Sequence, residues 1–272
     1  MSLRQPMNST IRYRAAASVL LIRDCIAADC GIEVLMLQRP GGISFAHSWV
    51  FPGGCLESQD KSSQWHAHIF GLTPEETAVQ LQLAKDPHSW WLAAVRELFE
   101  EAGILLAETR LSEDELAIAR AQLLAGTSDF LSLAQEHHWQ FDLSALVYQS
   151  FWIAPEWLAA RYATRFFVAP MPAGQQASPD GTEAIALQWL RPSEGIARQE
   201  ALKLPRPTLE NLKLLSQFES VADALSSLAE GDKSLMPAIW PSKASGEVQL
   251  SEVSQCLDAL DIVFEDDAAG AE

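Results

Sequence analysis

The chain has few positively charged residues for its length. Its 272 residues include 19 Lys and Arg against 36 Asp and Glu, which gives a formal net charge of −17. A charge of this sign argues against a general positive surface for nucleic acid or anionic lipid. We therefore expect no nucleic-acid partner and no membrane partner. A small anionic ligand remains compatible if cations gather at its site.

Cysteines are scarce and long apolar runs are missing. The four cysteines (Cys25, Cys30, Cys55 and Cys256) have no metal-ligand spacing, so free thiols in a reducing compartment are expected. No apolar run reaches the length of a membrane span, and the first residues lack a signal-peptide pattern. These features predict a cytoplasmic protein. The share of hydrophobic residues, 48%, suits one large globular domain.

The most informative stretch is residues 90–106, with the sequence WWLAAVRELFEEAGILL. Ser89 before it is a suitable N-cap and Gly103 a suitable stop, so the stretch predicts a helix. Apolar residues at helical spacing should turn one stripe of this helix toward the core. The residues of the stripe are Trp91, Ala94, Val95, Leu98 and Ala102.

Three carboxylates share the remaining face of this predicted helix. Glu97, Glu100 and Glu101 stand at i, i+3 and i+4, where like charges cost about 0.2–0.5 kcal/mol per pair. A hard divalent cation would remove the repulsion and prefers oxygen ligands. Arg96 can anchor a neighbouring loop through paired hydrogen bonds. The helix alone leaves two alternatives open, a metal site and an ordinary solvated charged face.

Two motifs decide between these alternatives. Residues 50–54, VFPGG, indicate a strand end that runs into a glycine turn, and residues 96–104 are RELFEEAGI. Together they resemble the nudix hydrolase family, whose box is G, five residues, E, seven residues and R-E-U-x-E-E-x-G-U, where U is aliphatic. The second half matches at every defined position. In the first half Gly54 fits, Asp60 replaces the Glu, and the spacer of 35 residues exceeds seven by 28 (35 − 7).

This split box is similar to that of the nudix motif 19-type proteins, whose animal members are coenzyme A diphosphatases. The segments RYATRFFVAPMP and EAIALQWLRPSEG are similar as well. The resemblance implies the α/β class and the nudix fold, with a mixed β-sheet sandwiched between helices (α/β/α) and a helical insertion inside the box. We expect a nudix domain at residues 11–229 with its insert at about 61–88. Residues 230–272 would form a C-terminal extension with a poorly ordered acidic tail.

The resemblance also implies hydrolysis of a diphosphate linkage with Mg²⁺ or Mn²⁺ as cofactor. Glu97, Glu100 and Glu101 would be metal ligands and catalytic residues. Arg96 would hold the glycine loop rather than touch the substrate. Glu183, just before the last predicted strand, is a candidate for a further metal ligand or a base, although a solvent-facing loop carboxylate fits it equally well.

Four further residues are candidates for the loop around the phosphates. Gly53 and Gly54 permit positive φ and close backbone approach, which a turn beside a phosphate requires. Arg39 ends a predicted strand in the family pattern. Asp60 would pair with Arg96, although its side chain is one methylene shorter than Glu and the insertion could move it.

The substrate stays open between several classes. The resemblance implies coenzyme A or acyl-coenzyme A, yet a second coenzyme A signature of the family is absent, because Ser44 and Ser48 replace its Arg and Gly. The alternative within the class is another nucleoside diphosphate, linked to a sugar or a nucleoside. The alternative from another class is a nudix-fold binding or regulatory module without turnover. The sequence is compatible with a homodimer.

Capping signals and apolar runs place the other elements. The box Thr73–Glu76 predicts a helix to about Lys85, and we expect the insert that contains it to cover the site and influence substrate choice. Further helices are predicted from Ser112 to near Gly126, at 128–136, at 204–218 and at 221–228. Strands are predicted at 15–23, 32–38, 143–153 and 163–171.

Overall fold

The computed structural model of the chain describes residues 12–26, 31–41, 46–158, 160–241, 248–251 and 261–263. Three sequence predictions concern segments outside these ranges. They are the loose first ten residues, the position of Ser44 and the acidic tail.

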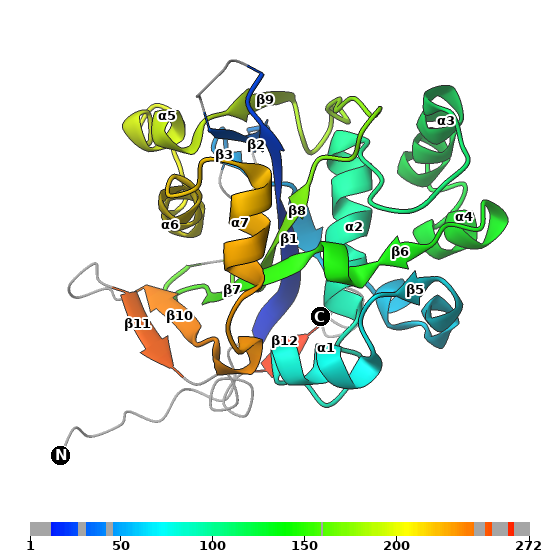
Figure 1. Cartoon of the computed structure of the whole chain (residues 1–272), viewed down its shortest axis with the longest axis horizontal. Helices are drawn as coiled ribbons and strands as arrows, with labels where there is room; N and C mark the ends of the chain where they lie inside the picture. The colour runs from blue at the N-terminus through cyan, green and yellow to red at the C-terminus, as the bar shows by residue number, and fades with distance from the viewer. Residues whose placement is uncertain are drawn as a thin grey trace.

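A mixed sheet of ten strands forms the middle of the molecule (Figure 1). Its main path runs in the order β11-β10-β7-β8-β1-β2-β3, while β4 and β12 also pair with β1, and β9 pairs with β2. The strands are β1 (Arg12–Asp24), β2 (Ile32–Gln38), β3 (Trp49–Val50), β4 (Gly53–Cys55), β7 (Val147–Ile153), β8 (Tyr162–Pro170), β9 (Ala186–Leu190), β10 (Ala238–Pro241), β11 (Val248–Ser251) and β12 (Asp261–Val263). Strand β1 is parallel to β8 and antiparallel to β2 and β4.

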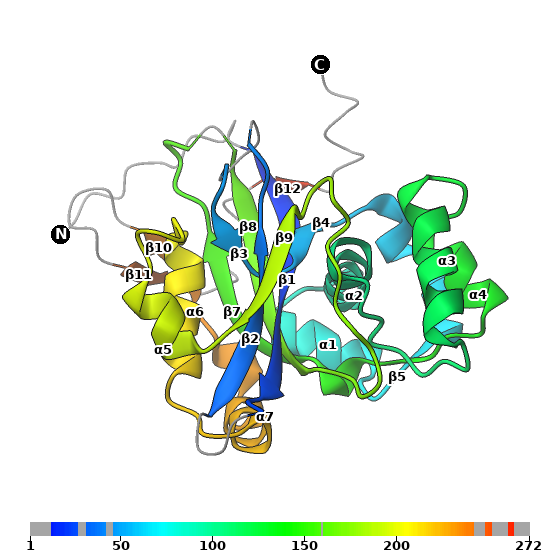
Figure 2. The same ribbon diagram turned by 90° about the horizontal axis from the view of Figure 1, so that it is seen from above.

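Helices cover both faces of this sheet (Figure 2). One layer contains α1 (Pro74–Leu81), α2 (Ser89–Ala102), α3 (Glu113–Leu124) and α4 (Phe130–Glu136). The other contains α5 (Pro192–Ala197), α6 (Arg206–Leu215) and α7 (Val221–Ala229). A short parallel pair, β5 (Ile69–Phe70) with β6 (Phe141–Asp142), lies beside the first layer. The predicted α/β/α arrangement is confirmed.

Strand β1 separates two apolar cores. Its side chains alternate between them: Val19 and Leu21 pack with α2, whereas Leu20 and Ile22 pack with α6 and α7. A strand with helices on both faces is apolar at successive positions, which explains the unbroken run AAASVLLI. The central strand therefore fixes where α2 stands relative to the sheet.

Helix α2 is buried nearly all round. It begins at Ser89, one residue earlier than predicted, and ends before Gly103, whose φ of 72° confirms the predicted stop. The apolar stripe is buried as expected, but Glu97 and Glu101 are buried as well, and among its residues only Glu100 is partly exposed. A solvated charged face is therefore the wrong interpretation of this helix.

The insert belongs to the core. Its capping box at Thr73 is confirmed, although α1 ends at Leu81 rather than Lys85 because Gln82 takes a left-handed conformation with φ 54°. Trp65 and Leu81 are both fully buried. Helix α1 lies beside the N-terminal end of α2 (Figure 1), where the buried Arg165 of β8 donates to the Leu81 carbonyl oxygen at 3.0 Å and lies 4.6 Å from the centroid of the Trp90 ring. Helix α1 thus does not cover the carboxylates near the C-terminal end of α2.

The other predicted elements are close to their observed bounds. Helices α3, α4, α6 and α7 and strands β1, β2 and β8 are present where the sequence predicts them. The segment 143–153 becomes a strand only from Val147, because Asp142 caps a short 3-10 turn over Leu143–Ala145. Strand β10 pairs with β7, β11 with β10, and β12 with β1, so three strands beyond residue 230 add to the same sheet.

The cysteines correct one expectation. Cys55 is a buried thiol outside any disulfide, as expected, but Cys25 is disulfide-bonded. Spacing identifies metal ligands but does not exclude a disulfide, so the expectation of free thiols is wrong for Cys25.

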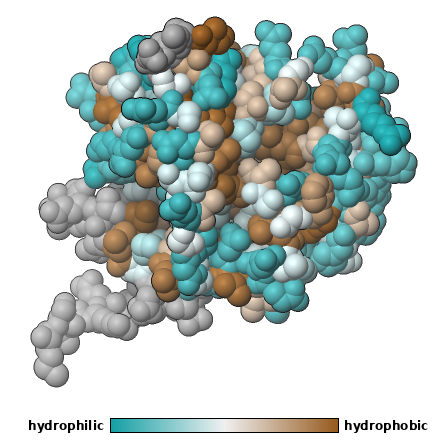
Figure 3. Space-filling model, in the orientation of Figure 1, coloured by the Kyte–Doolittle hydropathy of each residue, from teal (hydrophilic) through white to brown (hydrophobic). Residues whose placement is uncertain are grey.

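Most of the face seen in Figure 3 is hydrophilic, with apolar side chains scattered between. Large exposed apolar residues such as Val79 on α1 and Ile118 on α3 belong to different elements. Scattered apolar residues are normal on a protein surface. None of the helices in the described part of the chain is long and apolar enough to cross a membrane.

The buried position of Trp65 allows a test of whether the insert is part of the core. Its ring packs 5.7 Å from the rings of both Phe130 and Phe141, measured between centroids. We expect Trp65→Ala to lower the free energy of unfolding by about 3–5 kcal/mol, because it opens a cavity at the junction of insert and core. Val79→Ala on the exposed face of α1 is the control and should change it by less than about 0.5 kcal/mol. Equal values in urea denaturation would show that the insert is only a surface attachment.

Candidate active site

Arg96 forms the centre of the candidate site. Its side chain is 1% exposed, and its guanidinium donates to both carboxylate oxygens of Asp60 at 3.2 and 3.0 Å. Nη2 also donates to the Cys55 carbonyl oxygen at 2.8 Å, and Nη1 donates to Glu97 at 2.9 Å and to Glu100 at 3.1 Å. The predicted contact between Arg96, Asp60 and the glycine loop is confirmed.

A short 3-10 helix, Ser58–Lys61, compensates for the shorter Asp60 side chain. Asp60 lies at its N3 position, where its carboxylate accepts from the Glu57 backbone N–H at 2.8 Å in a capping box. This turn carries the fully buried Asp60 to Arg96. Glu57 was missed from the sequence: its Oε1 is 3.5 Å from Arg96 Nη1. The E-x-x-D spacing of a capping box was the signal that could have identified the turn.

The two glycines admit two carboxylates at close range. Strand β4 pairs Gly53 with Ser18 and Gly54 with Ala17 on β1. The Gly53 N–H donates to Oε2 of Glu101 at 2.8 Å. A Cβ on Gly54 would stand 2.5 Å from Oε1 of Glu97, so only glycine leaves that carboxylate room.

Burial and mutual repulsion make these carboxylates hard to ionise. Burial, with the nearby Glu183 and Asp180, raises the pKa of Glu101 to about 8, although the Gly53 N–H and Arg39 oppose the rise. Burial also raises the pKa of Glu97 well above its usual range, against the opposing charge of Arg96.

Glu100 is less buried than the two carboxylates beside it. Burial nevertheless raises its pKa to about 7, with Glu57 and Asp60 adding to the rise and Arg96 opposing it. Arg96 remains charged: burial acts against its charged form, but Asp60, Glu97 and Glu100 together raise the pKa of its guanidinium well above the usual range. One guanidinium therefore lowers the cost of ionising Asp60, Glu97 and Glu100 together, although their pKa values stay raised.

Glu183 approaches from the loop between β8 and β9. The carboxylate of Asp180 accepts backbone N–H groups of Thr182, Glu183 and Ala184 at 2.8, 2.9 and 2.7 Å. These bonds fix the turn that carries Glu183, whose charge contributes to the raised pKa values of Glu97 and Glu101. The Glu183 residue itself is exposed, so both of its predicted roles remain compatible with its position.

Arg120 on α3 ties this loop to the end of α2. Its Nε and Nη2 donate to the Glu100 carbonyl oxygen at 3.0 and 2.8 Å, and its Nη1 donates to Ser178 Oγ at 2.9 Å. The Ser178 N–H in turn donates to the Ala102 carbonyl oxygen at 2.9 Å. A cation at a helix C-terminus also stabilises the helix dipole. Sequence reasoning missed Arg120, Ser178 and Asp180, because nothing local marks contacts between segments so far apart.

Arg39 lies at the end of β2, on the same side as Glu101. Its positive charge is close enough to oppose the rise in the pKa of Glu101. Its Nε is buried and has no hydrogen-bond partner among the residues that the structure describes. A buried donor without a partner beside a carboxylate cluster suits a ligand that brings acceptor oxygens.

The carboxylate oxygens of the site suit a hard divalent cation, but they are not arranged as a complete set of metal ligands. Glu97 and Glu101 are buried carboxylates that repel each other, and a cation would remove the cost of ionising both. Within the described residues no group of three acidic, imidazole or thiolate side chains converges as a metal site. Glu100 is directed toward Arg96 instead. All the predicted site residues nevertheless gather in one region around Arg96 and the Gly53–Gly54 turn.

Comparisons with known proteins agree with this geometry. The model of the NUDT19 nudix domain family matches residues 13–213. The acyl-coenzyme A diphosphatase NUDT19 of Homo sapiens is 28% identical over 267 residues, which cover 78% of this chain and 71% of that protein. The protein of the same name from Gallus gallus is 29% identical over 275 residues, 80% of this chain and 72% of that protein.

One solved structure has a fold similar to that of this chain. The crystal structure of a nudix hydrolase from Alicyclobacillus acidocaldarius superposes with a TM-score of 0.64 at 26% identity. The superposition covers 82% of this chain and 100% of the other.

The two glycines should respond differently to alanine. At Gly53, with φ 153°, a Cβ would stand 2.4 Å from the Ala17 carbonyl oxygen, which belongs to the backbone and cannot yield. We expect Gly53→Ala to lower the free energy of unfolding by about 2 kcal/mol or more. At Gly54 the obstacle is the flexible end of Glu97, so Gly54→Ala should cost less than about 1 kcal/mol. Urea denaturation of both variants in metal-free buffer compares them, and equal losses would contradict the described turn.

Proposed function

The chain belongs to the nudix hydrolase family, and from this premise we propose that it is a metal-dependent diphosphatase of coenzyme A or acyl-coenzyme A. The observation that carries the proposal is the pair Glu97 and Glu101, buried against the Gly53–Gly54 turn, in a domain that matches the NUDT19 family model. The two named relatives are acyl-coenzyme A diphosphatases, which supports this substrate class.

Glu97 and Glu101 would hold Mg²⁺ or Mn²⁺, with Glu100 as a third ligand once its carboxylate turns away from Arg96. When bound, the cation would supply positive charge for the diphosphate and acidify water at the site. Arg96 keeps Glu97 and the β4 turn in place, because it donates to the Glu97 carboxylate and to the Cys55 carbonyl oxygen.

Residues around the turn would bind the diphosphate. Glycine at position 54 lets Glu97 lie directly against the turn, and the unpartnered Nε of Arg39 is a charged donor for a phosphate oxygen. Water adds to one phosphorus and the bridging oxygen leaves with the other phosphate. Glu183, in the turn fixed by Asp180, would accept the proton of the attacking water at its carboxylate. The products would be adenosine 3′,5′-bisphosphate and an (acyl-)phosphopantetheine.

Two other functions remain as alternatives. A nucleoside diphosphate linked to a sugar or a second nucleoside needs the same metal and phosphate contacts, so the site geometry fits it too. A non-catalytic nudix-fold module is disfavoured because Arg96, Glu97, Glu100 and Glu101 are all present. A module without turnover would have no need for carboxylates whose ionisation costs so much.

A substrate panel tests the proposal. The purified protein is incubated with Mg²⁺ or Mn²⁺ and coenzyme A, acyl-coenzyme A, nucleotide sugars or dinucleoside polyphosphates, and the products are separated and identified. We expect the coenzyme A compounds to have the highest kcat/KM and a chelator to abolish turnover. Faster turnover of nucleotide sugars or dinucleoside polyphosphates would contradict coenzyme A compounds as the substrate class and support the alternative. No turnover of any compound would support the non-catalytic module.

Glu101→Gln tests the metal ligand. The amide keeps the shape but loses the negative charge, so we expect kcat to fall about 100- to 1,000-fold at saturating Mg²⁺. Glu136→Gln, at an exposed carboxylate on α4, is the control and should keep the wild-type rate. A Glu101→Gln rate within about twofold of wild type would exclude the ligand role.

Stability of the same variant should not fall. Burial raises the pKa of Glu101 in the folded protein to about 8. Without metal, wild type therefore loses the stability that the protonated Glu101 carboxyl contributes as the pH rises from the ordinary carboxyl range through that value. Glutamine does not titrate, and Glu101→Gln should therefore be at least as stable as wild type near pH 8 in a metal-free thermal melt. A large loss of Tm would mean that the rate falls through unfolding.

A further inference from the structure

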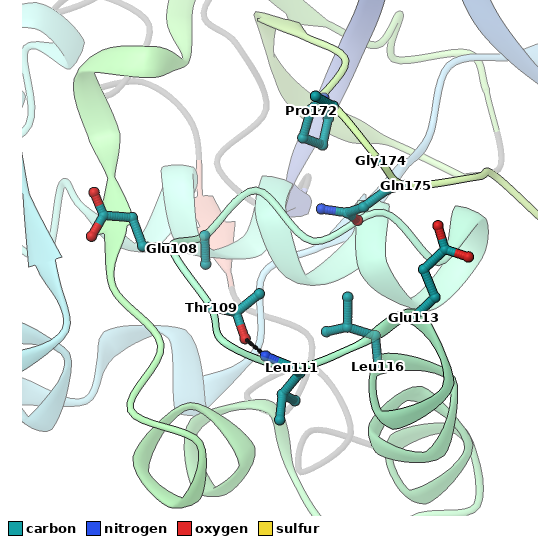
Figure 4. A pocket seen from close by; sticks show the side chains of 10 residues that line it. Glu108, Thr109, Leu111, Glu113, Leu116, Pro172, Gly174 and Gln175 are labelled. Atoms are coloured by element: carbon teal, nitrogen blue, oxygen red, sulfur yellow. Dashed lines mark hydrogen bonds between the residues drawn. The ribbon is translucent and has the colours of Figure 1, made fainter.

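A groove opens beside the C-terminal end of α2 (Figure 4). It lies between the segment after α2 with the start of α3, and the loop after β8, and its volume is about 430 Å³. Figure 4 shows Leu111 and Leu116 on one side and Pro172 and Gln175 on the other. A smaller cavity of about 240 Å³ shares part of this wall and extends to residues of β8 and the segment before β7.

One loop, residues 172–183, lines the groove and leads to the candidate active site. The Gln175 amide pairs with the backbone of Leu105, accepting from its N–H at 2.8 Å and donating to its carbonyl oxygen at 2.9 Å. Three residues on, Ser178 bonds to Ala102, and the loop then reaches Glu183. Leu105 follows Glu101 by four residues, so their Cα atoms lie no more than about 15 Å apart.

The acidic residues that line the groove favour some ligand groups over others. The charged side chains that line the groove in the described part of the chain are Glu108 and Glu113, and Asp142 lines the smaller cavity. Leu111, Leu116 and Pro172 provide apolar surface between them. Such a wall repels a phosphorylated nucleoside and suits a neutral chain with apolar segments.

We propose that this groove binds the pantetheine arm and acyl group of the substrate, an inference that rests on the function proposed above. An acyl-coenzyme A has two different halves on either side of its diphosphate. The adenosine half carries an extra phosphate, whereas the pantetheine half is uncharged. With about as many chain bonds as four amino-acid residues, the extended arm spans roughly 15 Å, which is long enough to reach from Glu101 past Leu105 at the wall of the smaller cavity.

The assignment also defines acyl specificity. The thioester end of the arm reaches the acidic residues Glu108 and Glu113, where an acyl chain with a terminal carboxylate would meet like charge. Neutral acyl groups should therefore be preferred over dicarboxylic ones of the same length. The adenosine half binds on the other side of the diphosphate and is not affected by this wall.

Product inhibition separates the two halves. Ala173 is an exposed residue of the groove wall, and Ala173→Trp places an indole in the groove. We expect the inhibition constant of 4′-phosphopantetheine to rise about tenfold or more, with that of adenosine 3′,5′-bisphosphate unchanged. Ala121→Trp, on an exposed position of α3 outside the groove, is the matched control and should change neither constant. If Ala173→Trp changes neither constant, or changes both equally, the groove assignment is overturned.

A charge exchange gives a second readout that does not depend on filling the groove. Glu108 is exposed at the groove, and Glu108→Lys should raise kcat/KM for succinyl-coenzyme A relative to butyryl-coenzyme A about fivefold or more. An unchanged ratio would place the acyl group elsewhere. If the wild-type protein turns over nucleotide sugars but no coenzyme A compound, the proposed function fails first. Turnover of coenzyme A with no response in either variant overturns the groove alone.

Discussion

The candidate site depends on one buried guanidinium. Arg96 contacts Asp60, Cys55, Glu97 and Glu100, and so connects the box helix α2 to the glycine turn and to the 3-10 turn after it. Without this cation, acidic side chains could not be enclosed at so little solvent exposure, because each would be protonated or unpaired. The pKa of Glu97 stays raised despite Arg96, and that of Glu101 stays raised despite the Gly53 N–H and Arg39, so the charge of these carboxylates is only partly compensated. The rest of the charge is available for a divalent cation.

The scaffold around this cluster is rigid for reasons of packing. Strand β1 serves two cores at once, and α2 is covered by the sheet on one side and by α3 and the insert on others. Trp65 makes the insert a part of that cover. Helix α3 supplies Arg120, which holds the C-terminal end of α2 and the loop of Glu183 at a common position. Segments far apart in the chain thus converge on the carboxylates.

The sequence predicted the helix and the glycine turn that carry the site, because each is marked by residues close together in the chain. Gly103, the run RELFEEAG and the glycine turn each follow from spacing and backbone preference, and the fold class followed from the family resemblance. Contacts of Arg120 with Ser178 and of Gln175 with Leu105 join segments about 60 to 70 residues apart. No spacing rule reports such contacts. The burial of Glu97 was missed for the same reason, since the walls around α2 come from the insert and the sheet.

The most direct measurement is a crystal structure of the protein grown with Mn²⁺, located by its anomalous signal. A metal site at Glu97 and Glu101 predicts a peak within bonding distance of carboxylate oxygens of both residues, beside the Gly53–Gly54 turn. The same map would show whether Glu100 leaves Arg96 to join them. Crystals that contain active protein and Mn²⁺ but show no peak between Glu97 and Glu101, or a peak at another cluster, would contradict the assignment of this site.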